Sequence, residues 1–234
     1  MAAASPSPSG PVTSIAEAIA RMKAIDAATP ASDGLACFNR MYLAVTETVG
    51  ADVDDGFFAD PEFMTTLDVT FANLYFAAAD AASDPAAVPL AWRPLIARRD
   101  APGIEPIQFA LAGMNAHINH DLPQAVVTTC ADLGTAPDAG THFADFQKVD
   151  QLLDASEQSI RQSFETSPEL AVDRHLQAVD DLVASWSINS ARDLACQNAL
   201  VLWALRPDEA VSGLFLDGLA ATTALASRLL LTAV

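Results

Sequence analysis

Residues 106–123 constrain the fold more than any other part of this sequence, because they begin apolar on every side and end polar within one predicted helix. The first half reads PIQFALAGM, and a helix that is apolar around its whole circumference belongs inside a protein. The second half reads NAHINHD before Leu122 and Pro123, and its polar groups need partners because unpaired buried polar groups cost free energy. We therefore predict a buried central helix with a polar cluster at its carboxyl end.

The polar cluster has its titratable groups on one helix face. Residues three and four positions apart share a face, which brings His117, His120 and Asp121 together. A carboxylate that orients an imidazole allows the ring to transfer protons near neutral pH. Gly113, one turn before His117, would let another helix or a ligand come close. We predict an acid/base site in which His117, His120 and Asp121 are the catalytic residues.

Polar and amphipathic residues in other apolar segments are the natural partners of this cluster. Such residues either pair with one another in the core or line a pocket. Neutral amides beside the histidines would position a substrate or stabilise developing charge. The residues that we expect to bind substrate are Asn115, Asn119, Asn39, Tyr42, Asn73, Tyr75 and Trp92.

Two other interpretations of the cluster stay open. The His–Asp pair could only satisfy itself, or cap the helix break imposed by Pro123. A metal ion could also bind, since the His-x-x-His and His-x-x-x-Asp spacings offer ligands from one helix face. The further ligands would come from Asp68, His142, Asp145, Asp150 or His175. Because the HExxH and repeated ExxH motifs of helical metal sites are absent, we predict no bound metal and no cofactor.

The remainder of the chain predicts helices throughout. Ala and Leu dominate, β-branched runs are few, and no Asn-Gly or Asp-Gly turn separates two alternating segments. Apolar residues recur at helical spacing from Ile15 onwards. We predict a single compact all-α domain, residues 12–234, of about eight to ten helices around the buried central helix. Residues 1–11 are expected to form a flexible tail.

Several helix boundaries can be predicted from individual residues. Asp60, followed by proline, marks a helix start as an N-cap. Residues 35–49 form a helix that ends in an acidic turn at residues 50–56. Pro123 kinks or restarts the central helix, because proline lacks the N–H that a helix interior needs. Ser167, also followed by proline, caps a later helix.

Charge and cysteine content bound the partners and the compartment. The formal net charge of −18 argues against nucleic acid and anionic membranes, which both need clustered Lys and Arg. Isolated cysteines without a CxxC motif indicate reduced thiols in a cytoplasmic protein, and the first residues do not resemble a signal peptide. The apolar residues 214–234 are interrupted by polar ones, so we expect a buried terminal helix rather than a membrane span.

Four short motifs carry a family resemblance. They are FNRMY (38–42), DPEF (60–63), FANxY (71–75) and GMNAHIN (113–119). Together they resemble an uncharacterised, mainly actinobacterial family of helical proteins, known as a domain of unknown function, over roughly residues 35–200. The resemblance implies no reaction, but it supports the choice of site and suggests a role in specialised metabolism.

The sequence as a whole favours an enzyme for a small apolar or amphipathic substrate held in a helix-enclosed, largely apolar pocket. His117, oriented by Asp121, would act as base or acid in a cyclisation, isomerisation, elimination or hydrolysis. Two alternatives are a metal-dependent enzyme that uses the same side chains and a non-catalytic protein that binds small molecules.

Overall fold

The structure, a computed structural model, describes residues 10–164 and 187–233, and gives the backbone alone for residues 154–164. Within those ranges the chain is made of helices and contains no strand, which confirms the predicted all-α fold. The predicted helix that begins at Ser167 and the metal-ligand candidate His175 lie outside the described residues.

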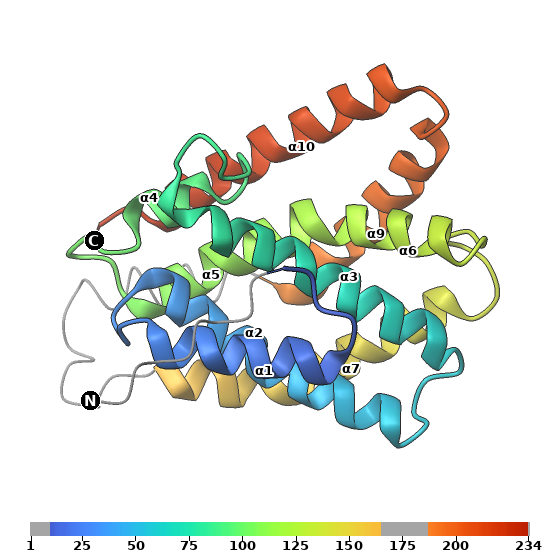
Figure 1. Ribbon diagram of the computed structural model, residues 1–234, viewed down its shortest axis with the longest axis horizontal. Helices are drawn as coiled ribbons and strands as arrows, with labels where there is room; N and C mark the ends of the chain where they lie inside the picture. The colour runs from blue at the N-terminus through green and yellow to red at the C-terminus, as the bar shows by residue number, and fades with distance from the viewer. Residues whose placement is uncertain (1–9, 165–186, 234) are drawn as a thin grey trace.

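Helix α5 (Pro106–Ala116) runs through the middle of the molecule, with α2 (Gly34–Asp54) and α10 (Glu209–Leu230) packed against it (Figure 1). Every residue of α5 from Gln108 to Ala116 is buried, which confirms the predicted central helix. The Gln108 side-chain amide donates to the backbone carbonyl of Leu230, so the start of α5 is tied to the end of α10.

The other helices surround this centre. Helix α1 lies on α2, α6 lies between α3 and α9, and α4 contacts α10 and α2. Counted together with α2, α5 and α10, these α-helices within the described ranges fall in the predicted interval of about eight to ten. Their bounds are α1 Ile15–Ala28, α3 Pro61–Asp80, α4 Arg93–Arg98, α6 Leu122–Asp132, α7 His142–Phe164 and α9 Ile188–Leu205.

Close contact between α2 and α5 depends on Gly113. A Cβ atom at this position would come within 2.4 Å of the Phe38 side chain of α2. Glycine therefore allows the phenyl ring to lie directly against the α5 backbone. The prediction that Gly113 lets a second helix approach is confirmed.

The central helix passes Pro123 through a wide turn. Residues His117–Asp121 form a π-helical segment, η2, in which the Leu122 amide donates to the His117 carbonyl. Pro123 then stands in the first turn of α6, where its missing N–H leaves no helical bond unmade. The prediction that Pro123 kinks or restarts the helix agrees with the new helix that begins at Leu122, and the π turn was not foreseen. Such turns often occur at functional sites.

The predicted end of the second helix is wrong. Helix α2 continues through the expected acidic turn to Asp54 instead of ending at residue 49. Gly50, which suggested a break, lies where α1 crosses, and a Cβ there would come within 3.0 Å of the Ile15 side chain. Its small size serves helix packing rather than helix termination.

Burial of the terminal helix is only partly as predicted. The buried residues of α10 begin at Ala220, and Leu214 is 72% exposed, so the prediction is wrong for the first half. The second half packs on α4 and α5, whereas the first half projects beyond them (Figure 1). Among the described residues α10 alone is long and apolar enough to cross a membrane, a test that core helices also pass.

The largest buried side chains gather where α2, α3 and the start of α4 meet. The Phe38 ring lies 5.1 Å from that of Tyr75 and 5.2 Å from that of Trp92, measured between ring centroids. At the amino end, Val12 is buried against the core, and residues 1–9 of the expected tail lie outside the described ranges. This aromatic core forms one side of the polar cluster on η2.

Candidate functional site

His117 and Asp121 form a buried pair, as their spacing predicted. His117 Nδ1 lies 3.0 Å from Asp121 Oδ2, and the two side chains are 2% and 4% exposed. An ionised carboxylate can only accept hydrogen bonds, so Nδ1 carries the ring proton. The lone pair of the neutral imidazole is therefore on Nε2.

Asp121 is held by more than one donor. Trp92 Nε1 donates to Oδ2 at 2.9 Å, and His120 Nδ1 lies 2.7 Å from Oδ1. Burial opposes ionisation of Asp121, but the hydrogen bonds from His117 and His120 outweigh it and lower the pKa of the carboxyl group. Trp92 and His120 thus contribute by fixing the carboxylate that orients His117.

Aromatic rings enclose the His117 imidazole. The ring stacks on Phe71 of α3 with centroids 3.5 Å apart, and the edge of Tyr42 from α2 approaches it at 4.5 Å. Burial lowers the pKa of His117, and the bond to Asp121 only partly offsets this. The imidazole is therefore neutral at pH 7. Its buried Nε2 has no hydrogen-bond partner in the part of the chain that the structure describes.

A cavity of about 80 Å³ opens beside His117. That is more space than a single water needs, and the lining is almost entirely apolar. The walls come from α2, α3, α5 to α6, α7 and the region of α9. The apolar lining residues are Phe38, Met41, Val45, Val49, Met64, Leu67, Phe71, Met114, Ile118, Leu122, Phe146, Val149, Leu153 and Ile188.

Four polar side chains also line this cavity: Tyr42, Asp68, His117 and Arg192. Arg192 is engaged, since its guanidinium binds the Asp150 carboxylate and donates to a backbone carbonyl. The other three each place a buried atom without a partner among the described residues: Tyr42 Oη, Asp68 Oδ2 and His117 Nε2. An unsatisfied buried polar group costs about 1–3 kcal/mol, so three around one cavity make this cavity the candidate binding site.

Burial also sets the protonation states of Asp68 and Tyr42. Asp68 is partly exposed as a residue, but its Oδ2 is enclosed, and burial raises the pKa of the carboxyl group to about 7. Burial and then the nearby Asp68 raise the pKa of Tyr42 well above its usual range. The phenol therefore keeps its proton at neutral pH. Sequence reasoning had considered Asp68 as a possible metal ligand and did not include it among the predicted substrate-binding residues.

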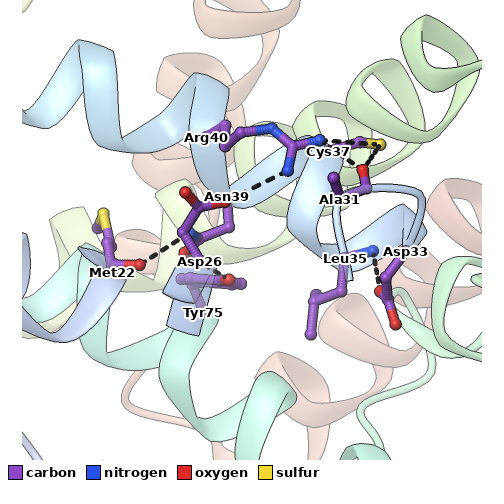
Figure 2. A network of polar contacts seen from close by, with 9 residues as sticks. All are labelled: Met22, Asp26, Ala31, Asp33, Leu35, Cys37, Asn39, Arg40 and Tyr75. Carbon is purple, nitrogen blue, oxygen red and sulfur yellow. Dashed lines mark hydrogen bonds and ion pairs between the residues drawn. The ribbon is translucent and has the colours of Figure 1, made fainter. Parts of the chain in front are cut away.

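Asn39 and Tyr75, both expected to bind substrate, bond to other protein groups (Figure 2). Asn39 Nδ2 donates to the Met22 carbonyl of α1, and the Tyr75 hydroxyl donates to Asn39 Oδ1, each at 2.9 Å. These bonds join α1, α2 and α3 on the core side of the cavity wall. Neither residue lines the cavity.

Of the remaining predicted amides, Asn73 and Asn115 likewise bond backbone groups, and Asn119 bonds another side chain. Asn73 bonds the backbone N–H and carbonyl of Val12. Asn115 donates to the Thr223 carbonyl and to a serine of α10, and Asn119 donates to Asn115 Oδ1. Of the predicted substrate-binding residues, all of which the structure describes, Tyr42 alone lines the cavity.

Two residues considered as metal ligands have partners of their own. Asp145 accepts the backbone N–H groups of Ala59 and Asp60 at the start of α3, and His142 stacks on Phe63. No group of three or more His, Cys, Asp or Glu side chains among the described residues is arranged to hold a metal ion.

Comparison with known proteins finds one family, whose function is unknown. No curated protein and no solved structure matches the chain. One family model, a family of unknown function (DUF5995), matches residues 15–233. This agrees with the resemblance to an uncharacterised family seen in the sequence motifs. Because the match spans nearly the whole chain, the protein belongs to the DUF5995 family.

Proposed function

We propose that the protein is an enzyme that moves protons on a small, largely apolar molecule bound in the cavity beside His117. One observation carries the proposal: at the cavity wall, His117 Nε2 is buried and has no partner among the residues that the structure describes, while Nδ1 is fixed by Asp121. An imidazole that only supported the structure would be expected to satisfy both nitrogens.

The electrostatics of the pair suit a general base. His117 is neutral at pH 7 and can accept a proton at Nε2, and the ionised Asp121 then stabilises the imidazolium that forms. Apolar walls exclude water and strengthen these interactions. General acid–base catalysis of this type contributes roughly 10²–10⁴-fold to a rate. The compatible reactions are cyclisation, isomerisation, elimination and hydrolysis.

A non-catalytic binding protein is the second candidate. The unpartnered polar atoms of the cavity could orient a ligand without converting it. The cytoplasmic location and the lack of a nucleic-acid or membrane partner remain predictions from composition.

The test compares wild type with His117→Asn, whose amide can still donate to Asp121 but has no base. Both proteins are incubated with small apolar esters, ketones, epoxides and β-hydroxy ketones, and products are followed by proton NMR. We expect turnover of one compound class by wild type and a loss on the order of a hundredfold in the variant. If a variant shown by circular dichroism to be folded keeps full turnover, the proposal fails. If compounds bind and none is converted, the binding-protein candidate replaces it.

A further inference from the structure

We propose that Tyr42 and Asp68 are paired hydrogen-bond donors for the oxygen of a carbonyl substrate, which His117 enolises by taking a proton from the adjacent carbon. This inference rests on the proposed function and narrows it to small apolar ketones and related carbonyl compounds. It also makes Asp68, which the sequence had offered as a possible metal ligand, a catalytic residue.

Three different elements bring the polar atoms to the cavity. Tyr42 comes from α2, Asp68 from α3 and His117 from η2, and all three line the same space. Phe71 lies three residues after Asp68, on the same face of α3, and stacks directly on the His117 ring. The Tyr42 ring meets that imidazole at 4.5 Å. The phenol and the imidazole are therefore neighbours, and the carboxyl group lies one turn from Phe71 on the wall of the same largely apolar cavity.

The polar atoms that lack hydrogen-bond partners indicate which kind of ligand would fit the cavity. Tyr42 Oη, Asp68 Oδ2 and His117 Nε2 lack partners among the described residues, so a bound molecule that offers polar contacts at this point would satisfy them. The rest of the lining offers almost no polar contact. A fitting ligand has one compact polar group and an apolar body.

The protonation states select a carbonyl group. Burial raises the pKa of Asp68 to about 7, so the group is about half protonated at neutral pH and below it is largely a carboxylic acid with an O–H to donate. Tyr42 keeps its phenolic proton because its pKa is raised by burial and by Asp68. Two O–H donors fit the two lone pairs of a carbonyl oxygen, and the Nε2 lone pair is left for an acidic C–H group.

The reaction balances without an outside oxidant or reductant. His117 Nε2 takes the proton from the carbon next to the carbonyl, and the C–H electron pair becomes a C=C bond. The carbonyl π pair moves to the oxygen, where Tyr42 and Asp68 stabilise the enolate by hydrogen bonds. The imidazolium returns the proton to the same carbon. When the substrate has a β,γ double bond, the enolate is conjugated with it, and the proton can return to the γ carbon, which completes an isomerisation.

An enolate mimic tests the donor pair separately from the base. The probe is 4-nitrophenolate, whose oxygen accepts hydrogen bonds as an enolate does, with binding followed by absorbance. We expect Tyr42→Phe and Asp68→Leu each to weaken binding about tenfold, since a hydrogen bond to a charged group contributes about 1.5–3 kcal/mol. His117→Asn should bind the probe nearly as well as wild type. The matched control is Tyr75→Phe, which removes a buried hydroxyl that bonds Asn39 instead of facing the cavity.

Proton exchange tests the chemistry. Cyclohexanone in D₂O reports deuterium uptake by NMR, and 3-cyclohexenone reports isomerisation to the conjugated enone by ultraviolet absorbance. Loss of one donor should slow both reactions on the order of a hundredfold, and His117→Asn should slow them at least as much. Tyr75→Phe should leave both rates unchanged.

The outcomes separate this inference from the proposed function. If His117→Asn abolishes turnover of any panel compound while Tyr42→Phe and Asp68→Leu leave probe binding and exchange intact, the donor pair is wrong and the acid/base proposal stands. If wild type hydrolyses esters but exchanges no ketone proton, the carbonyl assignment is overturned. Binding of cyclohexylamine through Asp68 in place of 4-nitrophenolate would overturn it as well, since the site would then recognise a cation.

Discussion

The imidazole of His117 lies flat on the phenyl ring of Phe71, with ring centroids 3.5 Å apart and planes 3° from parallel. The stack comes from two elements distant in sequence, η2 and α3. Asp121 fixes one nitrogen of the imidazole, and Phe71 fixes the plane of the ring. Together they leave Nε2 little freedom to turn away from the cavity.

Replacing Phe71 by Leu should therefore reduce turnover, which a control substitution with the same loss of stability should not do. We expect roughly tenfold slower conversion of the panel compound, because a small misplacement of a catalytic group is costly. The matched control is Phe63→Leu, which removes the Phe63 ring stacked on His142 outside the cavity. Both variants should lose about 1–3 kcal/mol in urea unfolding. Equal turnover in the two variants would show that the Phe71 stack does not position the base.

Asp121→Asn should disable His117 without removing it. The amide can donate to Nδ1, which favours the tautomer with its proton on Nε2 and leaves no base at the cavity. We expect turnover to fall on the order of 10²–10⁴-fold. ¹⁵N NMR of the histidine side chains should show the proton moving from Nδ1 to Nε2. His120→Gln is the control, because His120 contacts the same carboxylate but does not line the cavity, and its loss should cost far less.

Sequence spacing predicted the local part of the site, whereas of its long-range part the sequence indicated Tyr42 only as one of several polar candidates. The contact between His117 and Asp121 follows from four-residue spacing along one helix, so periodicity was enough to find it. The approach of Tyr42 and Asp68 depends on how α2 and α3 pack on η2, which no single segment encodes. An aspartate among apolar residues on α3 was the available signal for Asp68.

For the predicted amides the situation is reversed: the sequence singled them out, but they do not line the cavity. Asn39, Asn73 and Asn115 are polar residues in apolar helices, and their sequence context does not distinguish a pocket wall from a helix junction. In the structure each one bonds a backbone group of a distant segment. Buried amides have more hydrogen-bonding capacity than a helix neighbour can satisfy, so interhelical contacts of this kind are their usual role.

Gly113→Ala should destabilise the protein although alanine is the better helix former. The new Cβ would meet Phe38 at 2.4 Å, and relieving that clash forces α2 and α5 apart at a cost of about 1–3 kcal/mol. Gly213→Ala on α10 is the matched control, since nothing lies within 4 Å of its Cβ position. That variant should gain up to about 1 kcal/mol from helix propensity. Urea unfolding measures both, and destabilisation of similar size in both would contradict the packing role of Gly113.

Replacing Asp68 by Asn should change the stability of the protein relative to wild type in a pH-dependent way. The difference should favour the variant more at high pH than at low pH. The pKa of Asp68 is raised from 3.8 to about 7 in the folded state, so between these values the folded protein binds a proton that the unfolded chain has released. The stability from Asp68 is thus complete below pH 3.8 and is lost as pH rises towards 7. Asparagine has no charge to bury, so the variant should gain at pH 8, with an upper bound of about 4 kcal/mol.

For Asp145→Asn, the stability difference from wild type should change with pH in the opposite direction, and the same experiment measures it. Burial opposes ionisation of Asp145, but the amides of Ala59 and Asp60 and the Lys148 ammonium outweigh it and lower its pKa. Its stabilising effect is present above the unfolded pKa and disappears as pH falls through the folded value. Asp145→Asn should therefore be less stable than wild type at pH 8 and approach it in acid. Urea unfolding from pH 2 to pH 8 measures both differences, because the Asp68 effect changes between pH 3.8 and 7 and the Asp145 effect changes below pH 3.8. A pH-independent difference for Asp68→Asn would mean that the carboxyl group is already ionised at acidic pH, and Asp68 could not then donate a hydrogen bond to an enolate.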